Sequence, residues 1–220
     1  TSKGNAAIFG NMTTGRYAGS GVSSSTRCCA YGGYDDGLQD IIDYVTIASI
    51  GNATDFGDLT AARYELGATI NSSTRGIAHG GSTAPAKSNI MDYITIASTG
   101  DATDFGDLSA SKTNTTGVCS PTRGVVGGGS TPSKLNVMEY VTISSTGDVT
   151  DFGDMTVSAA ARASVCTHTR GVYAGGSTPS ASNVIDYITI ASTGDGTDFG
   201  DLITARNSWT GGISDSHGGI

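Results

Sequence analysis

The sequence predicts an all-β protein made of repeated four-stranded antiparallel units that pack side by side. Two observations predict it: a pair of motifs recurs four times in 220 residues, and the segments between them have the composition of strands. The first motif reads acidic-Tyr-(Ile/Val)-Thr-Ile-(Ala/Ser), and the second reads Thr-Asp-Phe-Gly-Asp. The first begins at Asp43, Asp92, Glu139 and Asp186, and the second begins at Thr54, Thr103, Thr150 and Thr197.

The phenylalanines of the second motif define the period. Phe56, Phe105, Phe152 and Phe199 are separated by 49, 47 and 47 residues. A period of this length is typical of architectures in which every repeat is one supersecondary unit. Because the same residues recur in every copy, we expect them to serve folding rather than one chemical event.

The first two strands of a unit are expected on either side of a polar turn. In the second unit the first strand is predicted over residues 64–70, and the run Asn-Ser-Ser-Thr that follows is predicted to turn the chain. The second strand is predicted over residues 75–81, where a glycine pair ends it. Residues 82–88 contain a proline and are predicted to be a loop.

The third and fourth strands are expected over residues 89–98 and 102–109, joined by a tight Thr-Gly-Asp turn. Along the third strand Ile90 and Ile94 alternate with Met91 and Tyr93, so neither face is wholly polar. Both faces of the sheet are therefore expected to be covered. A helical repeat is disfavoured, because apolar residues do not keep a 3.6-residue spacing and Gly, Ser and Thr are poor helix formers.

A sheet covered on both faces by neighbouring sheets is the blade of a β-propeller. The unit resembles the kelch repeat in its Arg-led first strand, its second strand ending in Gly-Gly, its third strand reading Asn-x-x-Asp-Tyr and its fourth strand starting at an aromatic residue. The resemblance covers nearly the whole chain and implies a kelch-like β-propeller of four-stranded antiparallel blades. The unit departs from the kelch pattern in one respect, because Phe stands where that family usually has Trp in the fourth strand.

The run Asp-Tyr-Ile-Thr-Ile-Ala-Ser-Thr-Gly-Asp-Ala-Thr-Asp-Phe-Gly-Asp-Leu is also similar to repeats of large structural proteins of marine bacteriophages. This second resemblance implies a viral structural protein, such as a part of a phage tail fiber, and implies nothing about mechanism.

The repeats divide the chain into one domain, residues 1–220. Four blades are predicted at about residues 16–62, 63–111, 112–160 and 161–205. Residues 4–12 align with residues 51–59, a fourth strand without the three before it, and the chain also ends in mid-unit. We expect a five-bladed ring whose composite fifth blade combines residues 1–15 with residues 206–220 but has no obvious third strand. The alternative is an arc of a larger propeller.

The amino-acid composition limits the classes of function that are expected for this protein. Charged residues make up 15% of the chain, 33 residues are glycine, and the net charge is −8. A polar and largely uncharged surface is expected, which suits a virion or an extracellular surface. The acidic balance without a basic cluster makes nucleic-acid binding unfavourable. No run of 18 apolar residues is present, so no membrane insertion is expected.

Recurring charged and aromatic residues are interpreted as structural. An Arg after the polar turn of each unit is expected to pair with an acidic residue of a neighbouring blade, a Tyr is expected to pack between blades, and a Phe is expected to fill the fourth strand. These structural residues are Arg27, Arg75, Arg123, Arg170, Tyr44, Tyr93, Tyr140, Tyr187, Phe56, Phe105, Phe152 and Phe199. The cysteines are expected to act mainly as buried small apolar residues, with a disulfide or a metal site as alternatives.

No cofactor, metal or catalytic residue is predicted. Carboxylates at every third position, such as Asp101, Asp104 and Asp107, could ligate calcium, but the preferred interpretation is that they accept backbone N–H bonds in turns. The kelch family includes a copper radical oxidase, whose site needs clustered ligands, whereas His79 and His168 share no motif. A kelch-type oxidase or a sialidase-like hydrolase is the third alternative for function.

Binding, if it is local, should lie where the copies differ most, in the loop after the glycine pair. The candidate binding residues are Tyr34, Asp35, Asp36, Lys87, Lys134 and Trp209. The first hypothesis is a non-enzymatic structural or attachment module of a virion appendage or cell surface, with other surface proteins or further copies of itself as partners. The second is a lectin-like propeller that binds a surface glycan.

Overall fold

The computed structural model describes residues 5–207, which form sixteen strands in four antiparallel sheets and contain no helix. The first sheet holds β1 (Ser20–Ser23), β2 (Arg27–Tyr31), β3 (Ile41–Thr46) and β4 (Thr54–Asp58). The second holds β5 (Gly67–Asn71), β6 (Arg75–His79), β7 (Ile90–Thr95) and β8 (Thr103–Asp107). The third holds β9 (Thr116–Cys119), β10 (Arg123–Gly127), β11 (Val137–Thr142) and β12 (Thr150–Asp154). The fourth holds β13 (Ala163–Cys166), β14 (Arg170–Ala174), β15 (Ser182–Thr189) and β16 (Thr197–Arg206).

The sheets follow the predicted unit. In every sheet the strands lie in chain order, and each strand pairs antiparallel with the next. We call these sheets blades 1 to 4. The first strand of blade 2 begins at Gly67 rather than at the predicted residue 64, because Tyr64 makes only an isolated bridge to Ser82.

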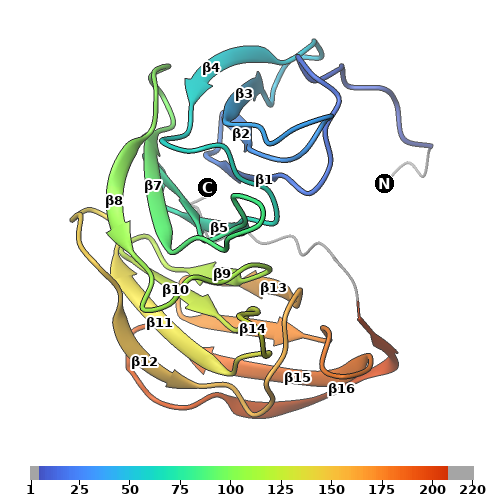
Figure 1. The fold of residues 1–220 in the computed structure, drawn as a ribbon, viewed down its shortest axis with the longest axis vertical. Helices are drawn as coiled ribbons and strands as arrows, with labels where there is room; N and C mark the ends of the chain where they lie inside the picture. The colour runs from blue at the N-terminus through green and yellow to red at the C-terminus, as the bar shows by residue number, and fades with distance from the viewer. Residues whose placement is uncertain (1–4, 208–220) are drawn as a thin grey trace.

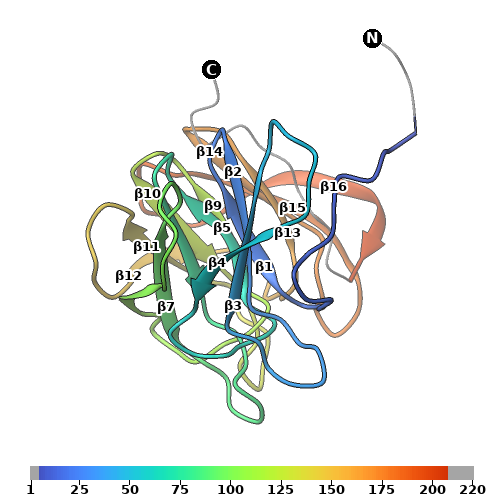
Figure 2. The ribbon, with the colours of Figure 1, turned by 90° about the horizontal axis from the view of Figure 1, so that it is seen from above.

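The four blades are arranged in a propeller-like arc (Figures 1 and 2). The inner strands β1, β5, β9 and β13 contact one another in series, and β4, β8, β12 and β16 lie at the outside. Figure 1 places blade 1 and blade 4 on opposite sides of an opening in this arc. The predicted composite fifth blade lies mostly outside the described residues, since residues 1–4 and 208–220 are not described.

Glycine pairs end the second strands for a steric reason. Gly80 and Gly81 have φ angles of 62° and 104°, which L-residues with side chains rarely adopt. A Cβ atom on Gly80 would also lie 2.6 Å from the carbonyl oxygen of Lys112. The pair therefore lets the chain of one blade touch the start of the next. The other blades repeat it at Gly32-Gly33, Gly128-Gly129 and Gly175-Gly176.

Each blade has a β-bulge between its third and fourth strands. In blade 2, Met91 pairs with Gly106 and Asp92 pairs with Asp104, so Phe105 is left without a partner on β7. Met91 and Asp92 lie on opposite faces of β7, and both are buried because neighbouring blades cover both faces of the sheet. The same shift occurs in blades 1, 3 and 4.

The hydrophobic core lies between the blades. Phe56 of blade 1 packs in one cluster with Ile94 and Ile96 of blade 2. Phe105 and Phe152 occupy the equivalent positions at the next two contacts between blades, in a second cluster that includes Ile143 and Ile190. The prediction that both faces of a blade are covered is thus confirmed for these internal sheets.

Candidate functional site

A buried ion pair holds each blade together. A cation located before the inner strand contacts the carboxylate that opens the first motif, and both side chains are almost fully buried in every case. The N–O distances are 2.8 Å for Arg16–Asp43, 2.6 Å for Lys112–Glu139 and 2.5 Å for Arg162–Asp186, and Arg63 and Asp92 form the fourth pair. Removing one partner of such a pair would leave an uncompensated buried charge.

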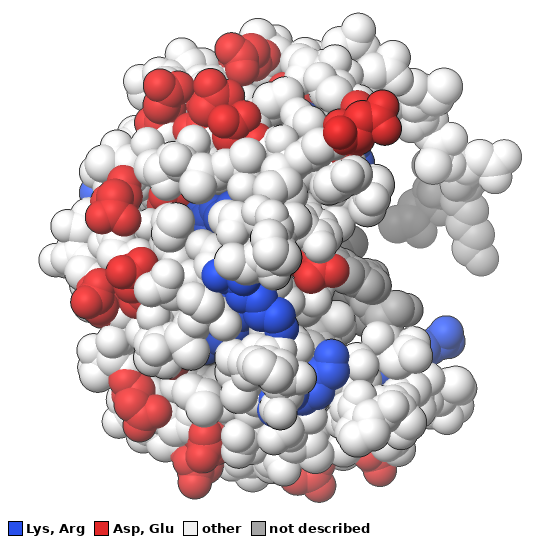
Figure 3. Space-filling view, in the orientation of Figure 1, with Lys and Arg blue, Asp and Glu red and all other residues white. Residues whose placement is uncertain are grey.

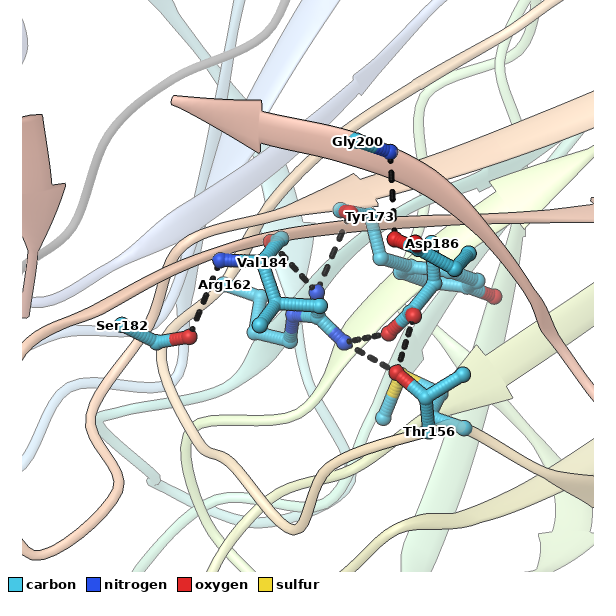
Figure 4. Close-up of polar contacts among 9 residues, drawn as sticks. Thr156, Arg162, Tyr173, Ser182, Val184, Asp186 and Gly200 are labelled. Atoms are coloured by element: carbon cyan, nitrogen blue, oxygen red, sulfur yellow. Dashed lines mark hydrogen bonds and ion pairs between the residues drawn. The ribbon is translucent and has the colours of Figure 1, made fainter. Parts of the chain in front are cut away.

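The pair in blade 4 shows how the remaining polar groups are satisfied (Figure 4). Arg162 donates to Asp186, to the carbonyl of Tyr173 at 3.1 Å and to the carbonyl of Val184 at 3.0 Å. The hydroxyl of Thr156 donates to the second carboxylate oxygen of Asp186. The guanidinium thus connects the residue before β13 with strands β14 and β15.

The sequence analysis missed these pairs. A constant spacing could have identified three of the cations. The second motif, or the N-terminal segment that aligns with it, is followed by an apolar residue, and the cation stands four residues after that apolar residue: Arg16 after Met12, Arg63 after Leu59 and Lys112 after Leu108. Blade 4 breaks the spacing, because Ala159 stands at that position and Arg162 supplies the cation from three residues later. Burial lowers the pKa of the Arg63 guanidinium, while Asp92 acts in the opposite direction.

The expected pairing of the second-strand arginines with acidic residues of neighbouring blades is wrong. The guanidinium of Arg75 instead lies 4.1 Å from the ring centroid of Tyr93 in its own blade and donates at 2.9 Å to the carbonyl of Ile143 in the next. The carboxylates that open the first motif pair instead with the buried cations described above. Arg27 and Arg123 make the equivalent contacts to the carbonyls of Ile96 and Ile190 at 2.9 and 3.1 Å, and Arg170 stacks over Tyr187 at 4.5 Å.

The tyrosines pack against the phenylalanines of the second motif. Tyr93 meets Phe105 edge to face, with ring centroids 6.0 Å apart. The geometry is nearly the same for Tyr44–Phe56, Tyr140–Phe152 and Tyr187–Phe199. Each blade therefore carries a stack of Arg on Tyr on Phe at its outer side.

Three hydrogen bonds join the second motif of one blade to the turn of the next, and we call this contact a junction. At the junction of blades 1 and 2, the N–H of Gly100 donates to the carbonyl of Phe56 at 2.7 Å and the N–H of Ala102 donates to that of Asp58 at 2.7 Å. The carboxylate of Asp101 accepts from the N–H of Asp58 at 3.1 Å. Asp148 and Asp195 accept in the same way at the next two junctions. The interpretation of these turn aspartates as acceptors of backbone N–H bonds is confirmed.

The N-terminal segment makes the same junction with blade 1. The N–H of Gly51 donates to the carbonyl of Phe9 at 3.0 Å, and the N–H of Ala53 donates to that of Asn11 at 2.8 Å. The N–H of Asn11 donates to the side-chain oxygen of Asn52 at 3.0 Å. A segment that corresponds to a fourth strand alone, without the other three strands of a blade, can therefore form these junction hydrogen bonds.

The predicted binding residues that the structure describes fall in two places, one around Tyr34 and one around Lys87 and Lys134. Tyr34 packs against Tyr17 and Tyr64, with ring centroids 5.6 and 5.9 Å apart, so three tyrosines from blades 1 and 2 meet there. Asp35 and Asp36 are exposed beside them. Tyr17 and Tyr64 were missed, because they precede their inner strands and only the structure brings them to the loop.

The two candidate lysines lie in blades 2 and 3. The ammonium of Lys87 donates to the carbonyl of Ser130 at 2.8 Å and to that of Thr131, so it connects the loops of the two blades. Partial burial lowers the pKa of Lys87 and the charge of Lys134 lowers it further, whereas Glu65 acts in the opposite direction. Trp209, the last candidate, lies outside the described residues.

Charge is unevenly distributed on the face shown in Figure 3. Basic side chains gather near its middle, and most acidic side chains lie around the outer edge. The outer carboxylates include the exposed Asp55, Asp104, Asp151 and Asp198 of the fourth strands.

Residues 5–207 contain no cluster of three or more His, Cys, Asp or Glu side chains that could hold a metal ion. The four cysteines form no disulfide, and Cys29, Cys119 and Cys166 are buried, as expected of small apolar residues. Burial raises the pKa of Cys29 to about 12. No helix in this part of the chain is long and apolar enough to span a membrane.

No protein-family model matches this sequence, and a comparison with curated proteins also finds no match.

Proposed function

We propose that this protein is a non-enzymatic repeat scaffold that acts as a structural or attachment module through protein–protein contacts. The observation that supports the proposal is that the recurring polar residues make structural contacts. The buried cations, the stacked arginines and the turn aspartates, which are the chemical groups common to all repeats, take part in contacts within or between blades. A repeat organised in this way transmits packing from one module to the next.

The proposed setting is a virion appendage or an extracellular surface. Its support is the similarity of the repeat to repeats of phage structural proteins, together with the low fraction of charged residues, 15%. The proposed complete architecture is a kelch-like propeller with a fifth blade that fills the opening of the arc, or an arc of a larger ring. The arrangement of the four blades in Figure 1 supports both forms.

A glycan-binding role is the second candidate. Equivalent shallow depressions occur in blades 3 and 4, where Tyr140 and Tyr187 lie beside turn hydroxyls and the carboxylates of Asp148 and Asp195. An aromatic ring beside hydroxyl and carboxylate groups is an arrangement that can bind a sugar.

One experiment separates the two functions. The purified chain is screened on a glycan array and imaged by negative-stain electron microscopy over a range of concentrations. The scaffold function predicts no saturable glycan binding, together with assemblies or incorporation into virions. Saturable binding that is lost in Tyr140→Phe or Tyr187→Phe, at the depressions, or in Tyr34→Ala or Asp35→Ala, at the loop, would refute it in favour of a lectin. Stoichiometric copper in the purified protein would instead support an oxidase.

A further inference from the structure

Blade 4 presents an outer flank that the same side chains cover at every other blade. Phe199 is 57% exposed, whereas Phe56, Phe105 and Phe152 are between 1% and 3% exposed. Ile203 is fully exposed on the same strand, and no atom of residues 5–207 lies within 4 Å of the position that a Cβ on Gly200 would occupy. Within residues 5–207, no turn occupies the position beside β16 that the Gly-Asp turns occupy at the other junctions.

The internal junctions specify what would cover this flank. At each of them the third strand of the following blade supplies two isoleucines, or a valine and an isoleucine, over the Phe ring, as Ile94 and Ile96 do over Phe56. The carbonyl of the residue four positions after the acidic residue accepts from the second-strand Arg. A Gly-Asp turn eight positions after the acidic residue then makes the junction hydrogen bonds.

In blade 4, three groups occupy the positions that bind the third strand and the Gly-Asp turn of the next blade at the internal junctions. Arg170 stacks on Tyr187 and is exposed, and among the described residues its guanidinium has no carbonyl from a neighbouring blade. The carbonyl of Phe199 and the backbone of Asp201 occupy the junction positions. Arg206 is the counterpart of Arg63 and Lys112, because its carbonyl accepts from Gly176 at 2.9 Å as theirs accept from Gly33 and Gly81.

All three groups would be satisfied by one extended segment. Its acidic residue would pair with Arg206, the carbonyl four residues later would accept from Arg170, and its Gly-Asp turn eight residues later would bond to Phe199 and Asp201. We propose that the outer flank of blade 4 binds a β-strand of the form acidic-Tyr-(Ile/Val)-Thr-Ile-(Ala/Ser)-Ser-x-Gly-Asp, donated by a partner polypeptide that carries the same repeat. This mode of binding adds a strand and a turn to an incomplete blade.

The copies of this motif within residues 5–207 are already paired in their own sheets. These four copies are the third strands of blades 1 to 4, each between two other strands of its own sheet. The sequence after Asn207 contains no copy of the motif, and Gly4-Asn5 matches only the turn. Figure 1 places the described N-terminal segment at blade 1, across the opening from β16.

One position departs from the repeat. Thr60, Ser109 and Thr156 donate their hydroxyls to the acidic residue of the following blade, whereas Ile203 stands at the equivalent position before Arg206. The incoming carboxylate therefore has one donor fewer than at the internal junctions. Introducing a hydroxyl here should strengthen binding, a result that nonspecific adhesion to an apolar strand would not give.

The probe is a fluorescent synthetic peptide with the sequence of residues 183–197, titrated with the purified full chain and followed by anisotropy. Saturable binding is expected. Gly200→Ala should weaken it about tenfold or more, because a Cβ at the equivalent Gly153 would lie 2.5 Å from a carbonyl oxygen of the neighbouring turn. Arg206→Gln should weaken it about tenfold. Ile203→Thr should tighten it about fivefold.

Controls separate binding from folding. Ile50→Ala alters an exposed residue of blade 1 and should leave binding unchanged. Changes in the peptide cannot unfold the protein. The same contacts are therefore also tested with two altered peptides, one with Asn at the position of Asp186 and one with a scrambled sequence. Equal binding of all these peptides would overturn the proposal.

The proposal rests on the scaffold function, but the two can fail separately. Absence of peptide binding in a chain that is silent on the glycan array would overturn the strand site alone. Peptide binding together with saturable glycan binding would overturn the scaffold function and leave the strand site. Concentration-dependent self-association that Gly200→Ala abolishes would assign the flank to a second copy and overturn the partner strand.

Discussion

The buried ion pairs of blades 2 and 3 suggest an exchange experiment. Blade 2 uses the longer cation with the shorter acid, Arg63 with Asp92, and blade 3 uses the shorter cation with the longer acid, Lys112 with Glu139. Both pairs are almost fully buried. We predict that Arg63→Lys and Asp92→Glu each destabilise the protein and that the double variant loses less stability than the sum of the two single losses.

The magnitudes follow from the contacts. Arg63 donates to the carbonyls of Gly80 and Ile90 at 2.7 and 2.8 Å, and Lys would leave at least one of them unsatisfied, at a cost of about 1–3 kcal/mol. Asp92→Glu adds a methylene to a closely packed site, which costs about 1–3 kcal/mol. Because the two changes compensate in length, we expect an interaction energy of about 1–2 kcal/mol in favour of the double variant.

The assay is urea denaturation followed by circular dichroism for the wild type, both single variants and the double variant. Asp104→Asn, at an exposed position of the same blade, serves as the control and should change stability by less than about 0.5 kcal/mol. The comparison of midpoints is valid where the slope with denaturant is unchanged. Additive single effects would show that the two side chains are not coupled and would refute the reasoning.

Three further predictions concern junctions and cysteines. Gly106→Ala should cost about 1–3 kcal/mol more than Gly200→Ala in urea unfolding, because both glycines have positive φ but only the first Cβ would meet a carbonyl oxygen, at 2.4 Å; equal losses would contradict the junction geometry. The pKa of Asp58 is raised above its ordinary value of 3.8, first by partial desolvation and then by the charges of Asp40, Asp101 and Asp55. Ionisation of Asp58 therefore lowers the stability of the folded state as the pH rises above this ordinary value. Asp58→Asn should therefore be more stable than wild type at pH 7, with the advantage lost near pH 3, and a constant advantage at both pH values would argue against this origin. Burial raises the pKa of Cys29 to about 12, so a thiol reagent at pH 8 should modify the folded protein slowly and the urea-unfolded protein quickly, and rapid modification of the folded form at this residue would contradict its burial.

Much of the repeat could be predicted from sequence because its signals are local. The polar turn, the glycine pair and the β-branched third strand each depend on a few neighbouring residues, and the strands of blade 2 were located to within a few residues. The turn aspartates were correctly interpreted as acceptors of backbone N–H bonds. Their donors, however, belong to the preceding blade, which a local interpretation could not identify.

The partners of charged residues could not be predicted. Arg63 and Asp92 lie far apart in the chain, and only the packing of the blade brings the carboxylate to the guanidinium. In blade 4 Arg162 reaches the same kind of carboxylate from a different position, so spacing alone would have selected Ala159. The meeting of Tyr17, Tyr34 and Tyr64 is likewise a product of tertiary structure.

The sequence by itself determined the class of the protein: four similar all-β units, each with a strand order set by turn residues and by strands that bury both faces. Only the tertiary structure decided which cation meets which acid, which blade supplies each junction donor, and that Phe199 is exposed in the described part of the chain while its three counterparts are buried. The physical reason is that strand formation depends on neighbours along the chain, whereas burial, pairing of charges and exposure of an edge depend on which repeats come into contact.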